Sequence, residues 1–213
     1  MDEAVLQSLV KWPAVPTCFG WLALDRRGAW RMRDDYAQTH RLPGDPIKNS
    51  ALNAFISRNY ASDTQGRYFF QNGPQRVFVD LDAAPWVVRM MPTNDLDCPW
   101  EMRTQCDGTL NPSGALLDEA GHIYIEGSLI ETVFESNVLA QSTTKANYVA
   151  TRRHSIALLH DHDLGLFSGL ATLQESTCSI AGEWRWNNKV LGLESIRSTE
   201  LEQRYAFQAH PRP

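Results

Sequence analysis

Residues 66–81 read GRYFFQNGPQRVFVDL, and this stretch decides the expected fold. The aromatic run before Asn72 is typical of a strand, and Asn-Gly is a favoured two-residue hairpin turn. Beyond the turn, the two-residue strand period places Val77 and Val79 on one face and Phe78 on the other. The stretch therefore predicts an antiparallel β-hairpin.

The pattern around this hairpin recurs later in the chain. The turn Leu24–Gly28 (LDRRG) resembles Leu117–Gly121 (LDEAG), and the aromatic run after Gly66 resembles the run GEWRWNN after Gly182. Because these matches share one order, we expect an α+β fold with two structurally related sub-domains, each an antiparallel sheet with a helix. Internal duplication would produce such a pair. The alternative is that hairpins and helices alternate in many unrelated α+β chains.

Helix and loop signals give the expected boundaries. Residues 2–12 have apolar residues at helical spacing, and Asp45 followed by Pro46 is typical of a helix start. Prolines and an Asp-Gly pair interrupt residues 92–113. We therefore expect three parts, which are a first α+β half with an N-terminal helix (1–95), a linker (96–113) and a second, diverged α+β half (114–213).

Composition excludes several classes of protein. The chain has 213 residues, 43% of them hydrophobic, and a net charge of −5, which fits a folded core and gives no strong case for a nucleic-acid partner. No apolar run approaches the roughly 20 residues that span a bilayer, and the N-terminus lacks the features of a signal peptide. The four cysteines form no C-x-x-C pair. We expect a cytoplasmic protein with free thiols and without a membrane partner.

A cluster of imidazoles and carboxylates is the candidate metal site. His160 and His162 would share one face of a strand, with Asp163 beside them, and these groups are common ligands of zinc, iron or manganese. The alternative is a strand that ends in a polar turn before a helix capped by Asp161 or Asp163. Because no H-E-x-x-H pattern supports the metal, we expect no cofactor and keep this cluster as an alternative only.

Arginines beside aromatic rings form the candidate binding surface. Such surfaces can grip a peptide or an anionic group. The predicted binding residues on the hairpin are Arg67, Tyr68, Gln71, Asn72, Gln75 and Arg76. The alternative is a half-buried sheet whose rings face the core while its arginines face water.

No catalytic residue is expected from the motifs. The chain has no G-x-S-x-G nucleophile motif, no phosphate-binding P-loop and no G-x-G-x-x-G fingerprint. Asp80 and Asp82 alternate on a predicted strand and could contribute to a divalent-ion site, or could lie on a solvated strand edge.

Five runs of the chain form a distinctive set: Trp12-Pro13, Gly20–Asp25, Trp30–Asp34, Gly66–Asp80 and Leu201–Pro211. In these runs the chain resembles an uncharacterised family of proteobacterial proteins. Residues 95–180 depart from that family's pattern. The resemblance implies no function, and it marks Arg67–Asp80 as a shared surface.

These observations favour a non-enzymatic binding or adaptor protein whose partner is a protein or a small anionic ligand. One alternative is a metal-dependent hydrolase that uses His160, His162 and Asp163, with Asp80 or Asp82 from the other half. A further alternative is a small-molecule sensor with a site between the halves. A homodimer is left open.

Overall fold

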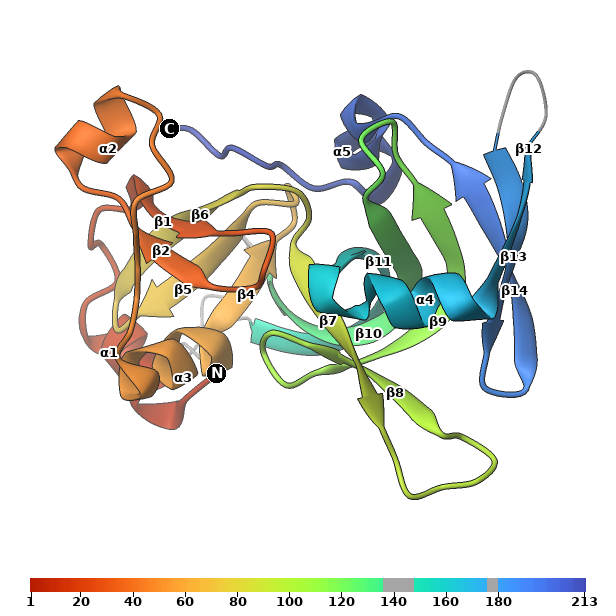
Figure 1. Ribbon diagram of the computed structural model, residues 1–213. Coiled ribbons are helices and arrows are strands. Elements are labelled where there is room, and N and C mark those ends of the chain that lie inside the picture. The colour runs from red at the N-terminus through yellow and green to blue at the C-terminus, as the bar shows by residue number, and fades with distance from the viewer. Residues whose placement is uncertain (136–147, 176–179) are drawn as a thin grey trace.

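The computed structural model describes residues 1–135, 148–175 and 180–213. In these ranges the chain forms fourteen strands and five α-helices (Figure 1). The strands are β1 (Cys18–Leu24), β2 (Trp30–Met32), β3 (Asp45–Pro46), β4 (Tyr60–Asp63), β5 (Tyr68–Asn72), β6 (Gln75–Leu81), β7 (Trp86–Pro92), β8 (Trp100–Thr104), β9 (Thr109–Leu117), β10 (Ile123–Phe134), β11 (Tyr148–Leu159), β12 (Ala171–Glu175), β13 (Ile180–Trp186) and β14 (Lys189–Ser195). The helices are α1 (Glu3–Lys11), α2 (Asp35–Thr39), α3 (Ser50–Arg58), α4 (Leu164–Leu170) and α5 (Leu201–Tyr205), with 3₁₀ turns η1 (Asp161–Asp163) and η2 (Ser198–Glu200).

All described strands belong to one mixed sheet. Its order is β12-β13-β14-β9-β8-β7-β11-β10-β4-β5-β6-β1-β2-β3. Neighbouring strands are antiparallel except in four pairs, β1–β6, β4–β10, β7–β11 and β9–β14, which are parallel. An additional β9–β10 pairing joins β9, β8, β7, β11 and β10 into a closed ring. Two strands of the ring also pair outside it, β9 with β14 and β10 with β4, so the ring is continuous with the rest of the sheet.

The expected fold class is wrong. The protein is mostly β, with 47% of the described residues in strands and 21% in helices, and these residues do not form a clear duplicated α+β pair. Each expected half of the chain contributes a parallel pair of its own, β1–β6 in the first and β9–β14 towards the second. The β4–β10 and β7–β11 pairs then join the strands of both halves into one sheet. The expected pair of duplicated antiparallel sheets is therefore corrected to one continuous mixed sheet.

Two of the predicted local elements are confirmed, and one predicted helix start is wrong. The hairpin of residues 66–81 is confirmed as β5 and β6, and the N-terminal helix is confirmed as α1. The helix start at Asp45 is wrong because Asp45 and Pro46 pair with β2, and α3 begins at Ser50 instead. Residues 96–113 contain β8 and the first part of β9. The division into parts at these residues stays a prediction.

The largest hydrophobic core runs through both ends of the sheet. It includes Leu24 and Tyr60 from the first half of the chain and Ile156 and Trp184 from the second. A smaller cluster of Ala61, Phe69 and Phe78 lies apart from it. The arrangement places apolar side chains from distant segments in one continuous interior.

The C-terminal tail returns to the first half of the chain. After α5 the chain crosses toward α2, and its end lies near that helix (Figure 1). The N–H of Leu81 donates to the carbonyl of Ala209 over 2.8 Å, and Gln208 N–H donates to the carbonyl of Gly66. This return places His210 and Arg212 beside the end of β6.

Candidate functional site

Asp80 is the centre of a charged cluster at the end of β6. Its carboxylate is almost fully buried and pairs with Arg33 from the segment after β2. Arg212 from the tail contacts the other carboxylate oxygen over 2.8 Å, and His210 Nδ1 lies 3.8 Å from it. One buried carboxylate therefore fixes two arginines and anchors the tail.

A cavity of about 680 Å³ opens beside this cluster. Its lining combines charged groups with the apolar side chains of Ala23, Leu42 and Pro43. A second hollow of about 430 Å³, lined by residues of the β1–β2 turn, shares Pro43, Asp82 and His210 with the first. The two hollows adjoin at these shared residues, and together we call them the tail groove.

The tail groove has a surplus of positive charge. Its lining contains six arginines, Arg26, Arg27, Arg31, Arg33, Arg41 and Arg212, and three aspartates, Asp25, Asp80 and Asp82. The whole chain has a net charge of −5, so the groove has the opposite sign to the molecule. Local surplus charge in a concave surface attracts counter-charged ligands.

Four of the six arginines already pair with carboxylates. Arg31 pairs with Asp25 over 2.7 Å, and Arg27 pairs with Asp161 over 2.7 Å, while Asp80 holds the two arginines described above. Within the described ranges, Arg26 and Arg41 have no carboxylate within ion-pair distance. These two guanidinium groups are therefore available to a ligand.

Two further features make the groove electrostatically unusual. Burial, and then the neighbouring Asp25, raise the pKa of Asp82, although its side chain keeps contact with solvent. The raised pKa favours the neutral form and weakens the negative side of the groove. The Nε atom of Arg33 is buried without a hydrogen-bond partner among the described residues.

An adjoining hollow of about 330 Å³ is lined in part by His122. The buried Asp118 carboxylate lies 2.8 Å from His122 Nδ1 and accepts the backbone N–H of His122 over 2.8 Å. Nε2 of His122 lies 3.4 Å from an Nη atom of Arg26. The imidazole is therefore held in one orientation, with its second nitrogen close to an arginine of the tail groove.

The predicted binding residues on the hairpin do not all share one face. Arg67 pairs with Asp63 over 2.8 Å and lies over the Phe78 ring, while Arg76 lies over the rings of Phe69 and Phe134. Both arginines therefore make contacts within the protein. Binding at this surface stays a prediction.

The other predicted hairpin residues have different surroundings. Tyr68 points into the main core and donates to the carboxylate of Glu131, and Gln71 is buried and accepts from Tyr148. Asn72 is exposed at the turn, and Gln75 donates to the carbonyl of Pro16. Both faces of β5 are buried from Tyr68 to Gln71, and exposure begins at the turn.

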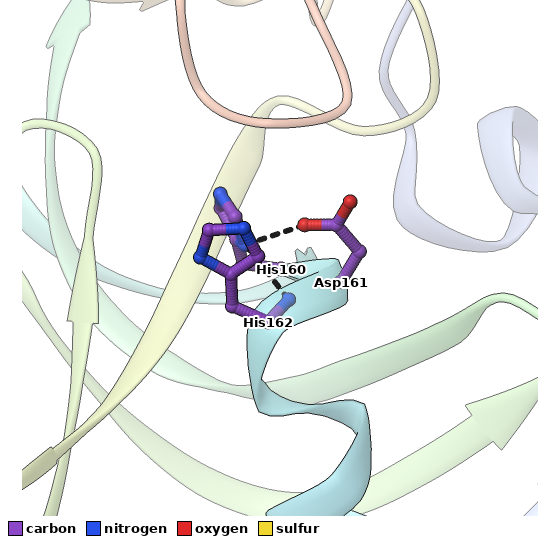
Figure 2. A group of neighbouring side chains, drawn as sticks. All are labelled: His160, Asp161 and His162. Atoms are coloured by element: carbon purple, nitrogen blue, oxygen red, sulfur yellow. Dashed lines mark hydrogen bonds and ion pairs between the residues drawn. The ribbon is translucent and has the colours of Figure 1, made fainter.

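The predicted metal cluster is only partly brought together. Ligand atoms of His160, Asp161 and His162 lie within 4.8 Å of one another (Figure 2). Asp163 is not among the grouped residues. The buried Asp163 accepts from Arg89 Nε over 2.7 Å and from the backbone N–H of Met90 over 2.9 Å. Asp80 and Asp82 line the tail groove and are not among the three grouped residues.

Comparison with known proteins places the chain in a family. The family model described as "Protein of unknown function (DUF2946)" matches residues 1–212. The chain belongs to this family. Its members carry no assigned function in that description, which confirms the expected membership of an uncharacterised family. No curated protein matches the chain.

One solved structure is similar to this member of the family. It is a DUF1285 family protein from Silicibacter pomeroyi with 13% sequence identity and a TM-score of 0.43, and the match covers 95% of this chain and 93% of that chain. Neither comparison favours the hydrolase or the sensor alternative. No helix in the described ranges is long and apolar enough to cross a membrane.

Most of the tail groove could not be predicted from local sequence patterns. The strand period singles out Asp80 and Asp82, but Arg41, His210 and Arg212 lie in segments without strand or helix periodicity. Their convergence depends on the return of the C-terminal tail. No local pattern in the sequence encodes that return.

Proposed function

We propose that the protein binds a small organic anion, with a carboxylate or phosphate group, in the tail groove. The observation that carries the proposal is the surplus of arginines in a cavity of an acidic protein. It is consistent with the expectation of a binding protein for a small anionic ligand. The cytoplasm stays the proposed compartment.

The size and chemistry of the groove support a metabolite-sized ligand. Ligand cavities usually have volumes of about 300–1,000 Å³, and the larger hollow has about 680 Å³. The planar guanidinium group matches carboxylate and phosphate oxygens in pairs, which gives both affinity and orientation. Leu42 and Pro43 supply an apolar wall for the rest of the ligand.

Arg41 and Arg26 are the groups that we expect to contact the anion. Arg33 and Arg212 share Asp80, so one of their two positive charges is compensated and both groups are held in place before a ligand arrives. Arg41 lines the larger hollow and is exposed, and Arg26 lines the smaller one. An anionic ligand between them would neutralise the positive charges of Arg41 and Arg26, which no described carboxylate neutralises.

Thermal unfolding with a panel of anions tests this function. The panel contains inorganic phosphate, pyrophosphate, succinate and citrate, with sodium chloride at matched ionic strength as the reference. A ligand at about 100 times its Kd stabilises the folded state by about 2.7 kcal/mol. For a chain of this size, that corresponds to a rise of several degrees in Tm.

Arg41→Ala is the informative variant, and Arg185→Ala is its control because Arg185 is exposed on β13, outside the groove. We expect Arg41→Ala to weaken binding of the active anion by about 10-fold or more, since a charge-assisted hydrogen bond contributes about 1.5–3 kcal/mol. The control should bind as the parent chain does. The proposal fails if no anion in the panel raises Tm, or if both variants bind equally well.

A further inference from the structure

The turn between β11 and α4 gathers three metal-ligating side chains outside the tail groove. His160 follows the last residue of β11, and Asp161 and His162 belong to the 3₁₀ turn η1. In an extended strand Asp161 would face away from its two neighbours. Because the chain curls at this point, one ligand atom from each residue lies within 4.8 Å of the others.

We propose that His160, Asp161 and His162 bind a divalent transition metal ion of the zinc class. Two imidazoles and a carboxylate suit zinc, and they disfavour magnesium and calcium, which prefer oxygen ligands. Three protein ligands leave at least one coordination position for water or another small ligand, as in open zinc sites. None of the three ligands lines the tail groove, although Arg27 of the groove contacts Asp161.

Neighbouring groups hold two of the three ligands in place. The backbone N–H of His160 donates to the carbonyl of Val88 over 3.0 Å, and the residue is buried. Arg27 contacts Oδ2 of Asp161 through Nε at 3.0 Å and through an Nη atom at 2.7 Å. Arg27 therefore orients the carboxylate while Oδ1 faces His160, an arrangement typical of the groups that support metal ligands.

The contacts of His160 Nδ1 compete with one another in the absence of a cation. This nitrogen accepts the backbone N–H of His162 over 3.1 Å, and it also lies 2.8 Å from Asp161 Oδ1 (Figure 2). An unprotonated Nδ1 satisfies the first contact and places its lone pair against a carboxylate oxygen. A protonated Nδ1 satisfies the second contact and loses the first. A divalent cation bound to Oδ1 and to Nδ1 would replace the repulsion between the two lone pairs by two attractive contacts, and it would take the place of the His162 N–H at Nδ1.

The site is open to ions from solvent. His160 is buried, whereas Asp161 and His162 are exposed. An incoming ion can therefore reach the ligands without unfolding the turn. Removal of the exposed His162 side chain should also leave the fold intact, which makes it the preferred position for a test.

Calorimetric titration of the chelator-treated full chain with zinc chloride tests the proposal. We expect one equivalent of zinc to bind, no binding of magnesium, and an affinity at least about tenfold lower for His162→Ala. His154→Ala is the matched control because it removes a largely exposed imidazole from β11, outside the group of three ligands, and it should keep the affinity of the parent chain. Equal losses in the two variants, or the absence of stoichiometric zinc binding, would overturn the proposal.

Cobalt substitution gives a second readout. Co²⁺ in a site of two imidazoles and a carboxylate should produce visible absorption bands that His162→Ala removes and His154→Ala keeps. Unchanged bands in His162→Ala would also overturn the assignment. Anion binding should be the same in His162→Ala and in the parent chain, so that failure of one proposal can be distinguished from failure of the other.

Discussion

Glu131 is a buried carboxylate on β10 that connects distant parts of the core. It accepts the Trp86 indole N–H over 2.9 Å and the Tyr68 hydroxyl at both oxygens, over 3.2 and 3.1 Å. Arg153 is its nearest cation, at 3.9 Å. Burial, and then the charge of Glu131, raise the pKa of Tyr68 well above its ordinary value, so this phenol stays neutral and donates.

Replacement of Glu131 by alanine should destabilise the protein strongly. The change leaves the Tyr68 hydroxyl and the Trp86 N–H buried without an acceptor, and each unsatisfied group costs about 1–3 kcal/mol. We expect Glu131→Ala to lower the free energy of unfolding by about 2–4 kcal/mol in urea denaturation. Glu183→Ala is the control, because Glu183 is exposed on β13 and should change stability by no more than about 0.5 kcal/mol. Similar stabilities for the two variants would contradict this role.

At the scale of single residues, the sequence predicts faces better than partners. Leu129, Glu131 and Val133 alternate along β10, and all three are buried, so the period of two indicates an inward position for Glu131. The period of two does not indicate that Tyr68 and Trp86 would donate hydrogen bonds to Glu131. For the same reason, the spacing of His160 and His162 predicts that they lie close together. The spacing does not predict that Asp161 joins them in place of Asp163, because this depends on the curl of η1 and on the ion pair between Asp163 and Arg89.

Gly66 lies in the turn between β4 and β5, and this turn contacts the C-terminal segment at Ala206. It has a φ of +74°, and a Cβ added to it would lie 2.0 Å from the carbonyl oxygen of Ala206. Gly121 in the β9–β10 turn has a similar φ of +83° but nothing within 4 Å of such a Cβ. The two glycines separate the cost of a left-handed backbone from the cost of close contact.

Gly66→Ala should therefore be more harmful than Gly121→Ala. Gly121→Ala carries only the left-handed backbone cost of about 1–2 kcal/mol. Gly66→Ala adds a clash with backbone atoms, and we expect a total loss of about 3 kcal/mol or more in the free energy of unfolding. Urea denaturation of both variants measures the difference. Equal losses would mean that the tail shifts away from the turn at little cost.

Elements with strong local signals could be predicted from the sequence. The Asn-Gly turn and the flanking aromatic and β-branched residues are sufficient for β5 and β6. Asp45-Pro46 imitates a helix start, but the segment pairs with β2, and the side chain of Asn49 caps α3 instead. At these two residues, pairing with the neighbouring strand β2 overrides the local preference for a helix start. The parallel pairs depend on contacts between segments far apart in the chain, which local patterns do not specify.

At the scale of the whole molecule, β7 joins the first and second parts of the chain. It lies in residues 1–95, but its two sheet neighbours, β8 and β11, lie beyond residue 95. β4 likewise pairs with β10 through Ser62 and Asp63. These pairings and the shared core cross the expected boundary at residues 96–113, although that division has yet to be tested.

Thermal unfolding of the full chain should therefore show a single cooperative transition. Near-ultraviolet and far-ultraviolet circular dichroism should report the same midpoint, because tertiary and secondary structure are lost together. A fragment of residues 1–95 should lack a dispersed amide NMR spectrum, since β7 would have neither neighbour and the Trp86 N–H would lose its acceptor on Glu131. Two separated transitions, or a cooperatively folded fragment, would instead support two independent domains on either side of residues 96–113.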